Sequence, residues 1–432
     1  MRRTRLFLLG ISFLYIVGIQ LGYVYLIGNR YGQGYFLLLP SFNEVFLASI
    51  MAWMPVWIIP IRLDKPSVSV SWLLYLMAYV PSIVLPSYTG VSDGFWLWRL
   101  FALMGCLIVV SPVYGKISLP SKSVSPLIYK VIVGGIFLLV GLTTLTHYGV
   151  RFHLPTPSEV YKVRYQYKTS VHSRWIGYAV EYLGNVFGAF AIAFALTRRR
   201  VFYFAIGLWF IIWEYSITAF KSVLFLPLML LGIWLLALGK RRKYFGLIVV
   251  VAYIAIIVVS FVTAKLFDLF HPLNLANIFF RRMLVVPGIV AGYYFSEFHN
   301  RPPILFSNGL LGGIFEYPFS APYQQIIAHV YFGYQGGNAV GNIWADAYVQ
   351  LGLVGILLMS VILRGLLEVI DAKWHSSTEE VVFASLVLSI HAFTLSNTSL
   401  QTTLLSHGLL LSSILLLLMP VETKQTLFGR GT

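Results

Sequence analysis

The chain has 432 residues, of which 58% are hydrophobic and 11% are charged, and its mean hydropathy is +0.80. A soluble domain carries about 25% charged residues, so this composition excludes an ordinary soluble protein and predicts an all-α polytopic integral membrane protein. Basic loops that flank membrane spans account for the formal net charge of +16, and we expect no nucleic-acid partner.

Apolar runs of about 20 residues mark the expected membrane-spanning helices. The first run follows Arg2, Arg3 and Arg5 and is too long for a signal-peptide core, so we expect it to stay in the membrane. No internal repeat or linker divides the sequence, which favours one membrane domain over 1–432, with outer loops at 149–174 and 267–344. About twelve spans are predicted, at 6–27, 35–60, 69–88, 96–114, 127–148, 175–196, 201–219, 222–239, 244–266, 345–369, 381–398 and 401–420.

Lysine and arginine residues predict the orientation, because the cytoplasmic loops of membrane proteins are enriched in both. With the amino terminus inside, the basic residues at 62, 65, 198–200 and 240–243 all fall on the cytoplasmic side. An even number of spans returns the carboxyl terminus to the same side. Both termini are therefore expected in the cytoplasm.

The third predicted outer loop departs from this rule, because residues 150–174 hold five Lys or Arg residues against one acid. Thr156 and Glu159 have the spacing of a capping box and Pro157 suits a first helical position, which predicts a short helix from Pro157 to about Lys168. Strict alternation in this segment equally suits a strand. A helix would place on one face Tyr161, Arg164, Tyr165 and Lys168. The segment is either an anchor among lipid headgroups or a site for phosphate and sugar.

The fifth predicted outer loop contains the arginine pair Arg281 and Arg282 at the start of an apolar stretch that continues to Phe298. The pair, together with Pro287, makes this stretch a poor spanning helix, so we expect it along the interface or partly re-entrant. A glycine-rich approach at 336–346 then leads into the tenth span. Such a segment suits close approach of the backbone to a ligand, and a tight turn is the alternative.

Ionisable residues inside the predicted spans fall at a shared depth, in the outer half of the membrane. Charges in hydrocarbon are costly and tend to be paired and functional, so this depth suggests one polar cavity that opens outward. For each residue, a structural ion pair or helix hydrogen bond is the alternative to a catalytic role. The residues are Glu44, Arg99, Glu181, Glu214, Lys221, Lys265, Asp346, His391 and His407.

Several other chemistries find no support in the motifs. Cys106 is the sole cysteine and lies in a predicted span, which excludes a disulfide framework and a thiolate metal site. The histidines show no metal-ligand spacing, and neither a Walker loop nor a dinucleotide fingerprint is present. We therefore expect no cofactor and no metal.

The arrangement of spans and loops resembles a known family, the Wzy-type polymerases of O-antigen, capsule or exopolysaccharide. The likeness rests on about twelve spans, the basic third outer loop and the large fifth outer loop with its arginine pair. Two local phrases add to it, at 160–167 and 341–355. An arginine followed by ten residues and a glycine, as in this family, occurs from Arg281 to Gly292 and from Arg301 to Gly312. Neither Arg151 nor Arg164 has a glycine at that spacing.

The resemblance implies a metal-independent, GT-C-like integral-membrane glycosyltransferase of the bacterial inner membrane. Such an enzyme polymerises undecaprenyl-diphosphate-linked oligosaccharide repeat units on the outer face, among membrane lipids and alongside a chain-length regulator and a flippase. Guanidinium groups would stabilise the departing diphosphate without a metal.

The resemblance also suggests roles for individual residues. Arg164, Arg281 and Arg282 are the first candidates for binding the diphosphate, followed by Arg151 and Arg301. Lys168 is a further candidate for binding the substrate. Tyr161, Tyr165 and Trp344 are candidates for stacking on sugar rings. A base within reach of the acceptor hydroxyl would assist catalysis, and the candidates are Asp346, His329, Glu316 and Glu181.

Three other functions remain open. A ligase that moves finished glycan to another acceptor shares this chemistry and differs only in the acceptor. A secondary transporter or flippase of lipid-linked oligosaccharide would bind near the midplane, usually within repeated halves. A structural membrane scaffold would have no reason to hold so many buried charges.

Overall fold

The computed structural model describes residues 2–111, 124–156, 158–171, 173–271, 273–309, 311–375 and 377–420. Throughout these ranges the regular structure is helical, without strands. Nine of the helical segments described are long and apolar enough to cross a membrane, which confirms an all-α polytopic membrane protein. Pro157, predicted to start a helix, and the carboxyl terminus, predicted to be cytoplasmic, lie outside the described residues.

The segments of spanning length correspond to most of the predicted spans. Three shorter apolar helices, Phe95–Val110, Lys221–Ala237 and Leu409–Leu418, lie where three further spans were predicted. The nine longer segments are Arg3–Arg30, Pro66–Tyr88, Pro126–Tyr148, Arg174–Arg198, Val201–Thr218, Gly239–Leu266, Ala276–Phe298, Ile343–Lys373 and Thr378–Leu395.

Two predicted elements differ from the structure. In place of one span over 35–60 there is a 12-residue helix, α2 (Phe42–Trp53), followed by the 3₁₀ turn η3 (Met54–Trp57). Pro40 and Pro55 interrupt this apolar run, because proline lacks the N–H that helix continuation requires. The stretch expected along the interface instead forms a spanning-length helical segment, the π-helix η8 (Ala276–Val285) continued by α13 (Val286–Phe298). Arg281 of this segment is buried against polar groups of the protein.

The chain divides into two compact units. Unit 1 comprises residues 1–114, 235–367 and 392–402, and unit 2 comprises 115–234, 368–391 and 403–432. Four helices cross these boundaries: α11 (Lys221–Ala237), α15 (Ile343–Lys373), α16 (Thr378–Leu395) and α17 (Leu400–Leu405).

Unit 1 is built around the segment from α3 (Pro66–Leu74) to η5 (Leu85–Tyr88), which is long enough to span a membrane and is fully buried. A helix that is apolar on all sides suits such a central position. Two tyrosines of this segment donate their hydroxyls to carbonyls of α2, Tyr75 to Ala52 and Tyr79 to Met51. The remaining helices of unit 1 are α1 (Arg2–Gly22), η1 (Tyr23–Ile27), η2 (Gly28–Arg30), α3 (Pro66–Leu74), η4 (Tyr75–Tyr79), α4 (Val80–Val84), η5 (Leu85–Tyr88), α5 (Phe95–Val110), η7 (Gly239–Tyr244), α12 (Phe245–Leu266) and α14 (Tyr323–Phe332).

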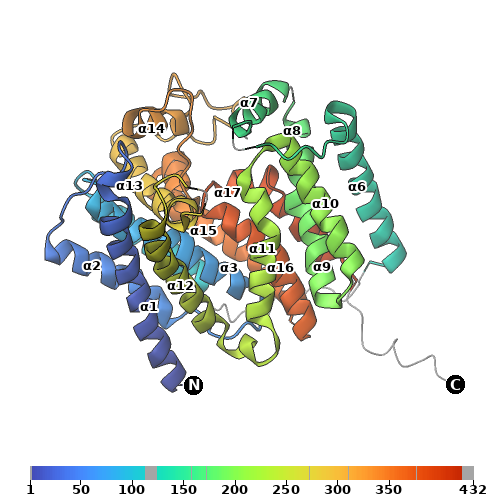
Figure 1. Ribbon diagram of the computed structural model, residues 1–432, viewed down its shortest axis with the longest axis horizontal. Coiled ribbons are helices and arrows are strands. Elements are labelled where there is room, and N and C mark those ends of the chain that lie inside the picture. Colours follow the sequence, from blue (N-terminus) through green and yellow to red (C-terminus); the bar gives the residue numbers. More distant parts are fainter. Residues whose placement is uncertain are drawn as a thin grey trace. The chain divides into compact units, whose positions relative to one another are not determined.

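The two ends of unit 1 carry different elements. Figure 1 shows the start of α1 at one end and α14 at the opposite end, where α13 also lies. At the α14 end, the loop after η2 packs against α14, since a Cβ on Gly34 would lie 2.3 Å from the ring of Phe332. At the other end, Arg5 contacts the carbonyls of Val56 and Ile59.

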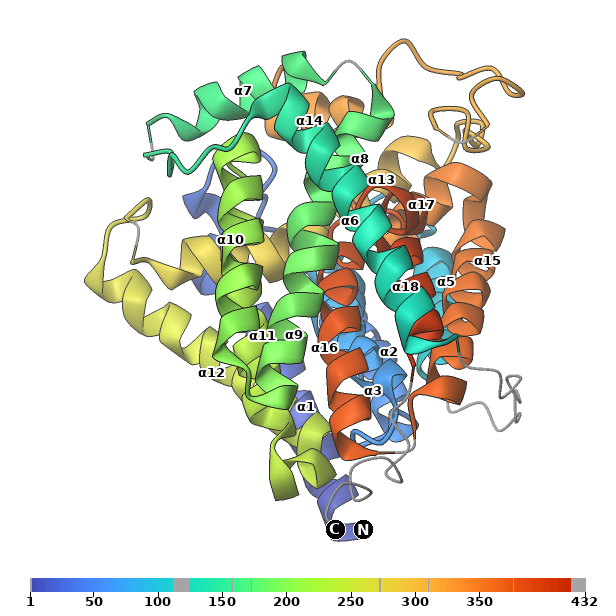
Figure 2. The same ribbon diagram turned by 90° about the vertical axis from the view of Figure 1, so that its right-hand side faces the viewer.

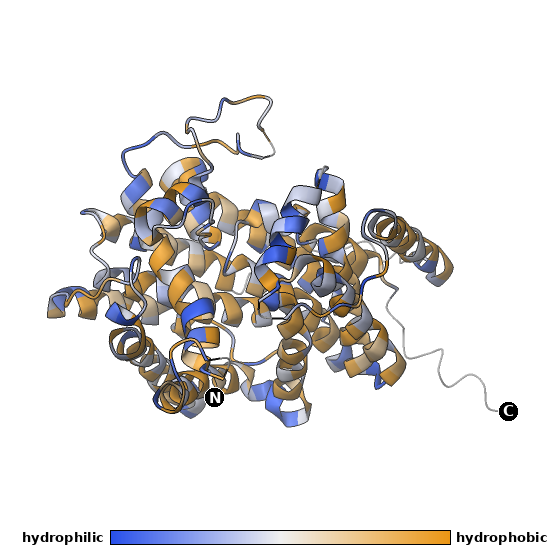
Figure 3. Ribbon diagram, turned by 45° about the horizontal axis from the view of Figure 1, so that its top comes forward, coloured by the Kyte–Doolittle hydropathy of each residue, from blue (hydrophilic) through white to orange (hydrophobic). Residues whose placement is uncertain are grey.

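Unit 2 packs its helices around an aromatic core that includes Phe187, Phe210 and Trp213. One of its helices, α6, is mostly exposed: only 11% of its spanning window is buried. Its residues are largely hydrophobic (Figure 3), as a helix that contacts lipid tails requires. The helices of unit 2 are α6 (Pro126–Tyr148), α7 (Val160–Ser170), α8 (Arg174–Tyr182), η6 (Leu183–Gly188), α9 (Ala189–Arg198), α10 (Val201–Thr218) and α18 (Leu409–Leu418).

Candidate functional site

A buried arginine with tyrosine and asparagine neighbours forms the first polar cluster of unit 1. Arg281 lies on η8 with 8% of its surface exposed. Its Nη1 donates to the hydroxyl of Tyr35 and its Nε donates to Oδ1 of Asn277, each over 2.8 Å. Its Cζ lies 4.6 Å from the ring centre of Tyr31 and 5.6 Å from that of Tyr35. We call Arg281, Tyr31, Tyr35 and Asn277 the arginine cage.

The arginine cage holds a positive charge with no acidic partner. Among the described residues, no carboxylate oxygen lies within 4.0 Å of Arg281. The hydroxyl of Tyr31 is buried and also has no hydrogen-bond partner among them. Burial raises the pKa of the Tyr31 phenol, and the charge of Arg281 opposes that shift. Because an uncompensated buried cation and an unmet buried donor are both costly, the arginine cage has the chemistry of an anion site.

The loop that supplies both tyrosines is fixed by close packing. Gly34 has a φ of +81° and no room for a Cβ beside Phe332. Its carbonyl accepts a hydrogen bond of 2.8 Å from the hydroxyl of Tyr293 on α13, and the ring of Tyr35 lies 5.6 Å from that of Phe332 on α14. Contacts with α13 and α14 therefore set the position of the arginine cage before any ligand arrives.

The other two predicted arginines of unit 1 lie at the surface. Arg282, next to the arginine cage on η8, is exposed. Arg301 is exposed as well and forms an ion pair with Glu297, four residues earlier. Its Cζ is 5.7 Å from the ring centres of both Phe298 and Phe319. The charge of Arg301 is thus already balanced, whereas Arg282 remains available to solvent or ligand.

Asp346 belongs to a second polar cluster of unit 1, in the first turn of α15. Its carboxylate accepts from the hydroxyl of Tyr323 at the start of α14 and, over 3.4 Å, from the side-chain amide of Gln350. Burial and the negative charge of Asp346 raise the pKa of Tyr323, which keeps the phenol protonated as a donor. Asp346 therefore ties α14 to α15.

Trp344 and Asn342 also hold the start of α15 in place. The indole of Trp344 is fully buried and donates to the hydroxyl of Ser360 over 3.0 Å. Oδ1 of Asn342 accepts from the backbone N–H of Trp344 and of Ala345, as an N-cap side chain does. The structure places Trp344, predicted to stack on sugar, inside the helix packing.

Helix α14 contacts both clusters, one at each of its ends. Tyr323 at its first position binds Asp346, and Phe332 at its last position contacts Tyr35 of the arginine cage. Nine helical steps of 1.5 Å place these two contacts about 14 Å apart along the helix. The Asp346 cluster and the arginine cage thus contact opposite ends of α14.

The remaining two predicted bases of unit 1 are exposed. His329 lies on α14 three residues before Phe332, so the two share one side of adjacent turns. Glu316 lies in the irregular segment before α14. Of the three acid–base candidates in this unit, His329 is the one on α14, one turn from the residue that contacts the arginine cage.

In unit 2, the predicted basic segment forms the helix α7, not a strand. Figure 2 shows α7 at one end of α10. Nε and Nη2 of Arg164 both donate to the carbonyl of Ala219, over 3.1 and 3.0 Å. Ala219 caps α10 with a φ of +51°, unusual for alanine. Arg164 therefore fastens α7 to α10, while the exposed surface of α7 includes Tyr161, Tyr165 and Lys168.

Arg151 also contacts a helix terminus in unit 2. Its Nε donates over 2.9 Å to the carbonyl of Tyr148 at the end of α6, where the helix leaves its last carbonyls without partners. The rest of the side chain is exposed. Thr156 and Glu159 form part of the predicted capping interaction: the backbone N–H of Thr156 donates to Oε2 of Glu159 over 2.9 Å.

The buried carboxylates of unit 2 are paired with histidine and backbone. Nδ1 of His407 lies 3.0 Å from Oε2 of Glu181, which also accepts from the side-chain amide of Asn185 over 3.1 Å. Glu214 is fully buried and accepts from the backbone N–H of Gly184 over 2.7 Å. Its Oε1 has no hydrogen-bond partner among the described residues. Burial and the charges of these two carboxylates raise the pKa of Tyr167 on α7.

Within each unit, the structure brings together residues that the sequence did not connect. Tyr31, Tyr35 and Asn277 were not predicted as partners of Arg281, nor Tyr323 and Gln350 as partners of Asp346. The spacing i, i+4 links Asn277 to Arg281 and Asp346 to Gln350, and helix geometry makes such pairs neighbours. Tyr31 and Tyr35 are more than two hundred residues from Arg281 in sequence, and no local signal marks them.

Among the described residues, no group of three or more His, Cys, Asp or Glu side chains is placed to hold a metal ion.

Comparisons with known proteins leave the family open. No family model matches the chain, and neither a curated protein nor a solved structure matches it.

Proposed function

We propose that this protein is a Wzy-type polymerase that joins undecaprenyl-diphosphate-linked oligosaccharide repeat units on the outer face of a bacterial inner membrane. The arginine cage carries the proposal. Among the described residues, the buried guanidinium of Arg281 has no acidic partner and the buried phenol of Tyr31 has no acceptor. This pair matches the needs of a diphosphate, which supplies negative charge and acceptor oxygens together.

The reaction is a glycosyl transfer. A hydroxyl of the incoming unit attacks the anomeric carbon of the growing chain, and the bond from that carbon to the diphosphate oxygen breaks. The electron pair leaves with the lipid diphosphate, whose negative charge rises. Arg281 stabilises this charge from its fixed position in the arginine cage, and the exposed Arg282 beside it adds a second cation.

The hydroxyl proton requires an acceptor close to the diphosphate, since the attacked carbon is one oxygen away from phosphorus. His329 meets this requirement better than Asp346. It lies one turn from Phe332 and its side chain is exposed, whereas Asp346 is bound at the other end of α14 and is engaged by Tyr323 and Gln350. We assign His329 as the base and Asp346 as the residue that positions α14.

The exposed tyrosines and lysine of α7 suit a sugar-bearing ligand in the same proposal. Tyr161 and Tyr165 are 73% and 71% exposed, and aromatic faces of this kind stack on sugar rings. Arg164 orients them by holding α7 on α10. Its role is to position the helix, in contrast to the direct contact proposed for Arg281.

A transporter or flippase of lipid-linked oligosaccharide is the second candidate, and one observation favours it. The pair Glu181–His407 and the fully buried Glu214 lie in or beside spanning-length helices of unit 2, as in proton-linked transport. A ligase shares the chemistry of the polymerase and differs in its acceptor.

Surface glycans of cells lacking the gene test these functions. Loss of a polymerase should leave single repeat units on the surface, because export and ligation of one unit need no joining step. Loss of a ligase should leave polymer on the lipid carrier. If deletion removes even single units and strands lipid-linked precursor in the cytoplasmic leaflet, the polymerase proposal is wrong and the protein is a flippase.

A further inference from the structure

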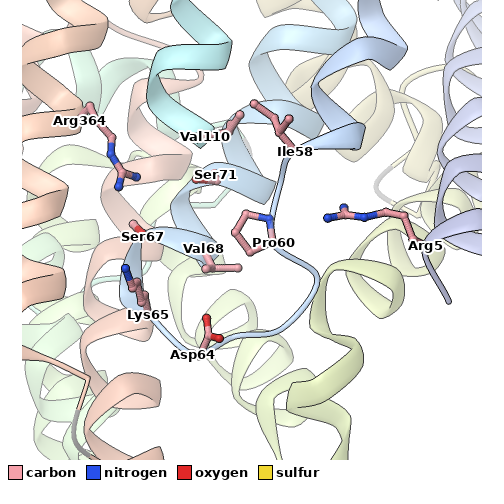
Figure 4. A pocket seen from close by; sticks show the side chains of 10 residues that line it. All are labelled: Arg5, Ile58, Pro60, Asp64, Lys65, Ser67, Val68, Ser71, Val110 and Arg364. Atoms are coloured by element: carbon pink, nitrogen blue, oxygen red, sulfur yellow. The ribbon is translucent and has the colours of Figure 1, made fainter. Parts of the chain in front are cut away.

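A pocket of about 330 Å³ lies in unit 1 at the end that carries the start of α1, opposite to α14 (Figure 4). Its charged lining comes from three parts of the chain: Arg5 on α1, Asp64 and Lys65 before α3, and Arg364 on α15. Three cations therefore face one carboxylate. None of these residues belongs to the arginine cage or to the network of Asp346.

The wall of this pocket is fixed by backbone hydrogen bonds. Nη1 of Arg5 donates to the carbonyls of Val56 and Ile59, over 3.0 and 2.7 Å. The indole of Trp72 donates to the carbonyl of Pro60 over 2.8 Å, and the backbone N–H of Leu63 donates to the backbone carbonyl of Arg242 over 3.0 Å. The loop between η3 and α3 is thus held open as a preformed surface, which lowers the entropic cost of binding.

The cations approach the pocket from different sides. Figure 4 shows Arg5 and Arg364 extending toward it from opposite directions, with Pro60 and Val68 between them. Only 6% of the surface of Arg364 is exposed. The first turn of α3 contributes Ser67 and Val68 to the lining, and the side chain of the N-cap residue Lys65 makes no capping hydrogen bond at this helix end. Its dipole adds to the positive potential.

We propose that this pocket binds a phosphate-bearing anion, either the phosphodiester headgroup of an anionic lipid or a soluble phosphate. The volume lies at the lower end of the range for small-ligand sites, about 300 to 1,000 Å³, and two guanidinium groups suit phosphate oxygens. The site is independent of the proposed polymerase reaction, and its test uses binding rather than activity.

The test measures the melting temperature of the purified full-length protein in neutral detergent. Phosphatidylglycerol should raise it and phosphatidylcholine should not, because a ligand that binds the folded state stabilises it. Inorganic phosphate is the second arm. Protection by phosphate at similar concentrations identifies a soluble ligand, whereas protection by phosphatidylglycerol alone identifies a lipid headgroup.

Substitutions assign the effect to the pocket. Lys65→Gln, at an exposed position, should raise the half-maximal ligand concentration about tenfold, as expected for one lost charge-assisted contact. Asp64→Asn should lower it by a similar factor, an effect that a merely structural role would not give. Arg200→Gln removes an exposed cation of unit 2 and should change nothing. Equal weakening by Arg200→Gln and Lys65→Gln, or no protection by either phosphate compound, would overturn the proposal.

Discussion

Arg281 donates a 2.8 Å hydrogen bond to the hydroxyl of Tyr35, a residue 246 positions away in the chain. Tyr35 lies in the loop after the first span, and Arg281 lies on a π-helix within another. π-Helical turns are rare and often occur at functional sites. This contact helps to hold a buried charge that has no acidic partner among the residues the structure describes, and the proposed function depends on it.

The two cage tyrosines should respond differently to loss of their hydroxyls. Tyr35→Phe removes the acceptor of Nη1 of Arg281 and should lower the free energy of unfolding by about 1 to 3 kcal/mol. Tyr31→Phe removes a hydroxyl with no partner among the described residues, so stability should be unchanged while polymer formation falls. Thermal unfolding in detergent and a polymerisation assay measure both. If both variants match the wild type in stability and in polymer formation, the two hydroxyls contribute neither to folding nor to the reaction.

Arg164 should stabilise the protein by holding α7 on the end of α10. Arg164→Lys loses the two-pronged contact with the carbonyl of Ala219 and should destabilise the protein by about 1 to 3 kcal/mol. Ala219→Gly should stabilise it by about 1 kcal/mol, because glycine adopts a positive φ without strain. Chemical unfolding of each variant checks this. An Arg164→Lys protein of normal stability that makes no polymer would instead make Arg164 a direct substrate ligand.

His329 and Asp346 separate catalysis from positioning. His329→Gln removes the proposed base at an exposed position and should reduce polymer formation about 10²- to 10⁴-fold without changing the melting temperature. Asp346→Asn weakens the bond from Tyr323 and should lower stability by about 1 to 3 kcal/mol. The assignment is reversed if Asp346→Asn is stable and inactive while His329→Gln is active.

Cysteine labelling tests the predicted orientation in intact cells. With Cys106 replaced, single cysteines at 65, 199 and 242 should be shielded from a membrane-impermeant thiol reagent, because the basic loops that contain them are expected in the cytoplasm. A cysteine at 166, on α7, should label. Labelling at 199 together with protection at 166 would invert the topology and remove the outward-facing site.

Composition and apolar run length predicted the fold class, because a lipid-facing helix must satisfy its backbone internally and present apolar side chains. They did not predict where such a run stops being one helix. At 35–60 the hydropathy is continuous, yet α2 ends at Trp53 and Pro55 follows in η3. At Ala276–Phe298 the arginine pair suggested an interface, whereas burial of Arg281 in the arginine cage permits a spanning-length segment.

Individual site residues were harder to interpret than spans. Sequence marks a cation, but its role depends on partners that tertiary packing supplies. Arg164 was predicted as a first candidate with Arg281, and Arg301 as a second one, yet Arg164 holds the carbonyl of Ala219 and Arg301 is paired with Glu297. Trp344 looked like a sugar platform, and its buried indole is bonded to Ser360.

The most direct test of the central claim measures polymer formed by purified protein from lipid-linked repeat units, with Arg281→Lys and Arg301→Lys compared at equal membrane abundance. The planar fork of arginine holds a diphosphate, and lysine supplies only a point charge. Arg281→Lys should therefore lose about 10²-fold or more in rate, equivalent to nearly 3 kcal/mol. Arg301→Lys, whose charge is already paired with Glu297, should stay close to wild type, and wild type should remain active in excess chelator. Normal polymerisation by a folded Arg281→Lys protein would contradict the account.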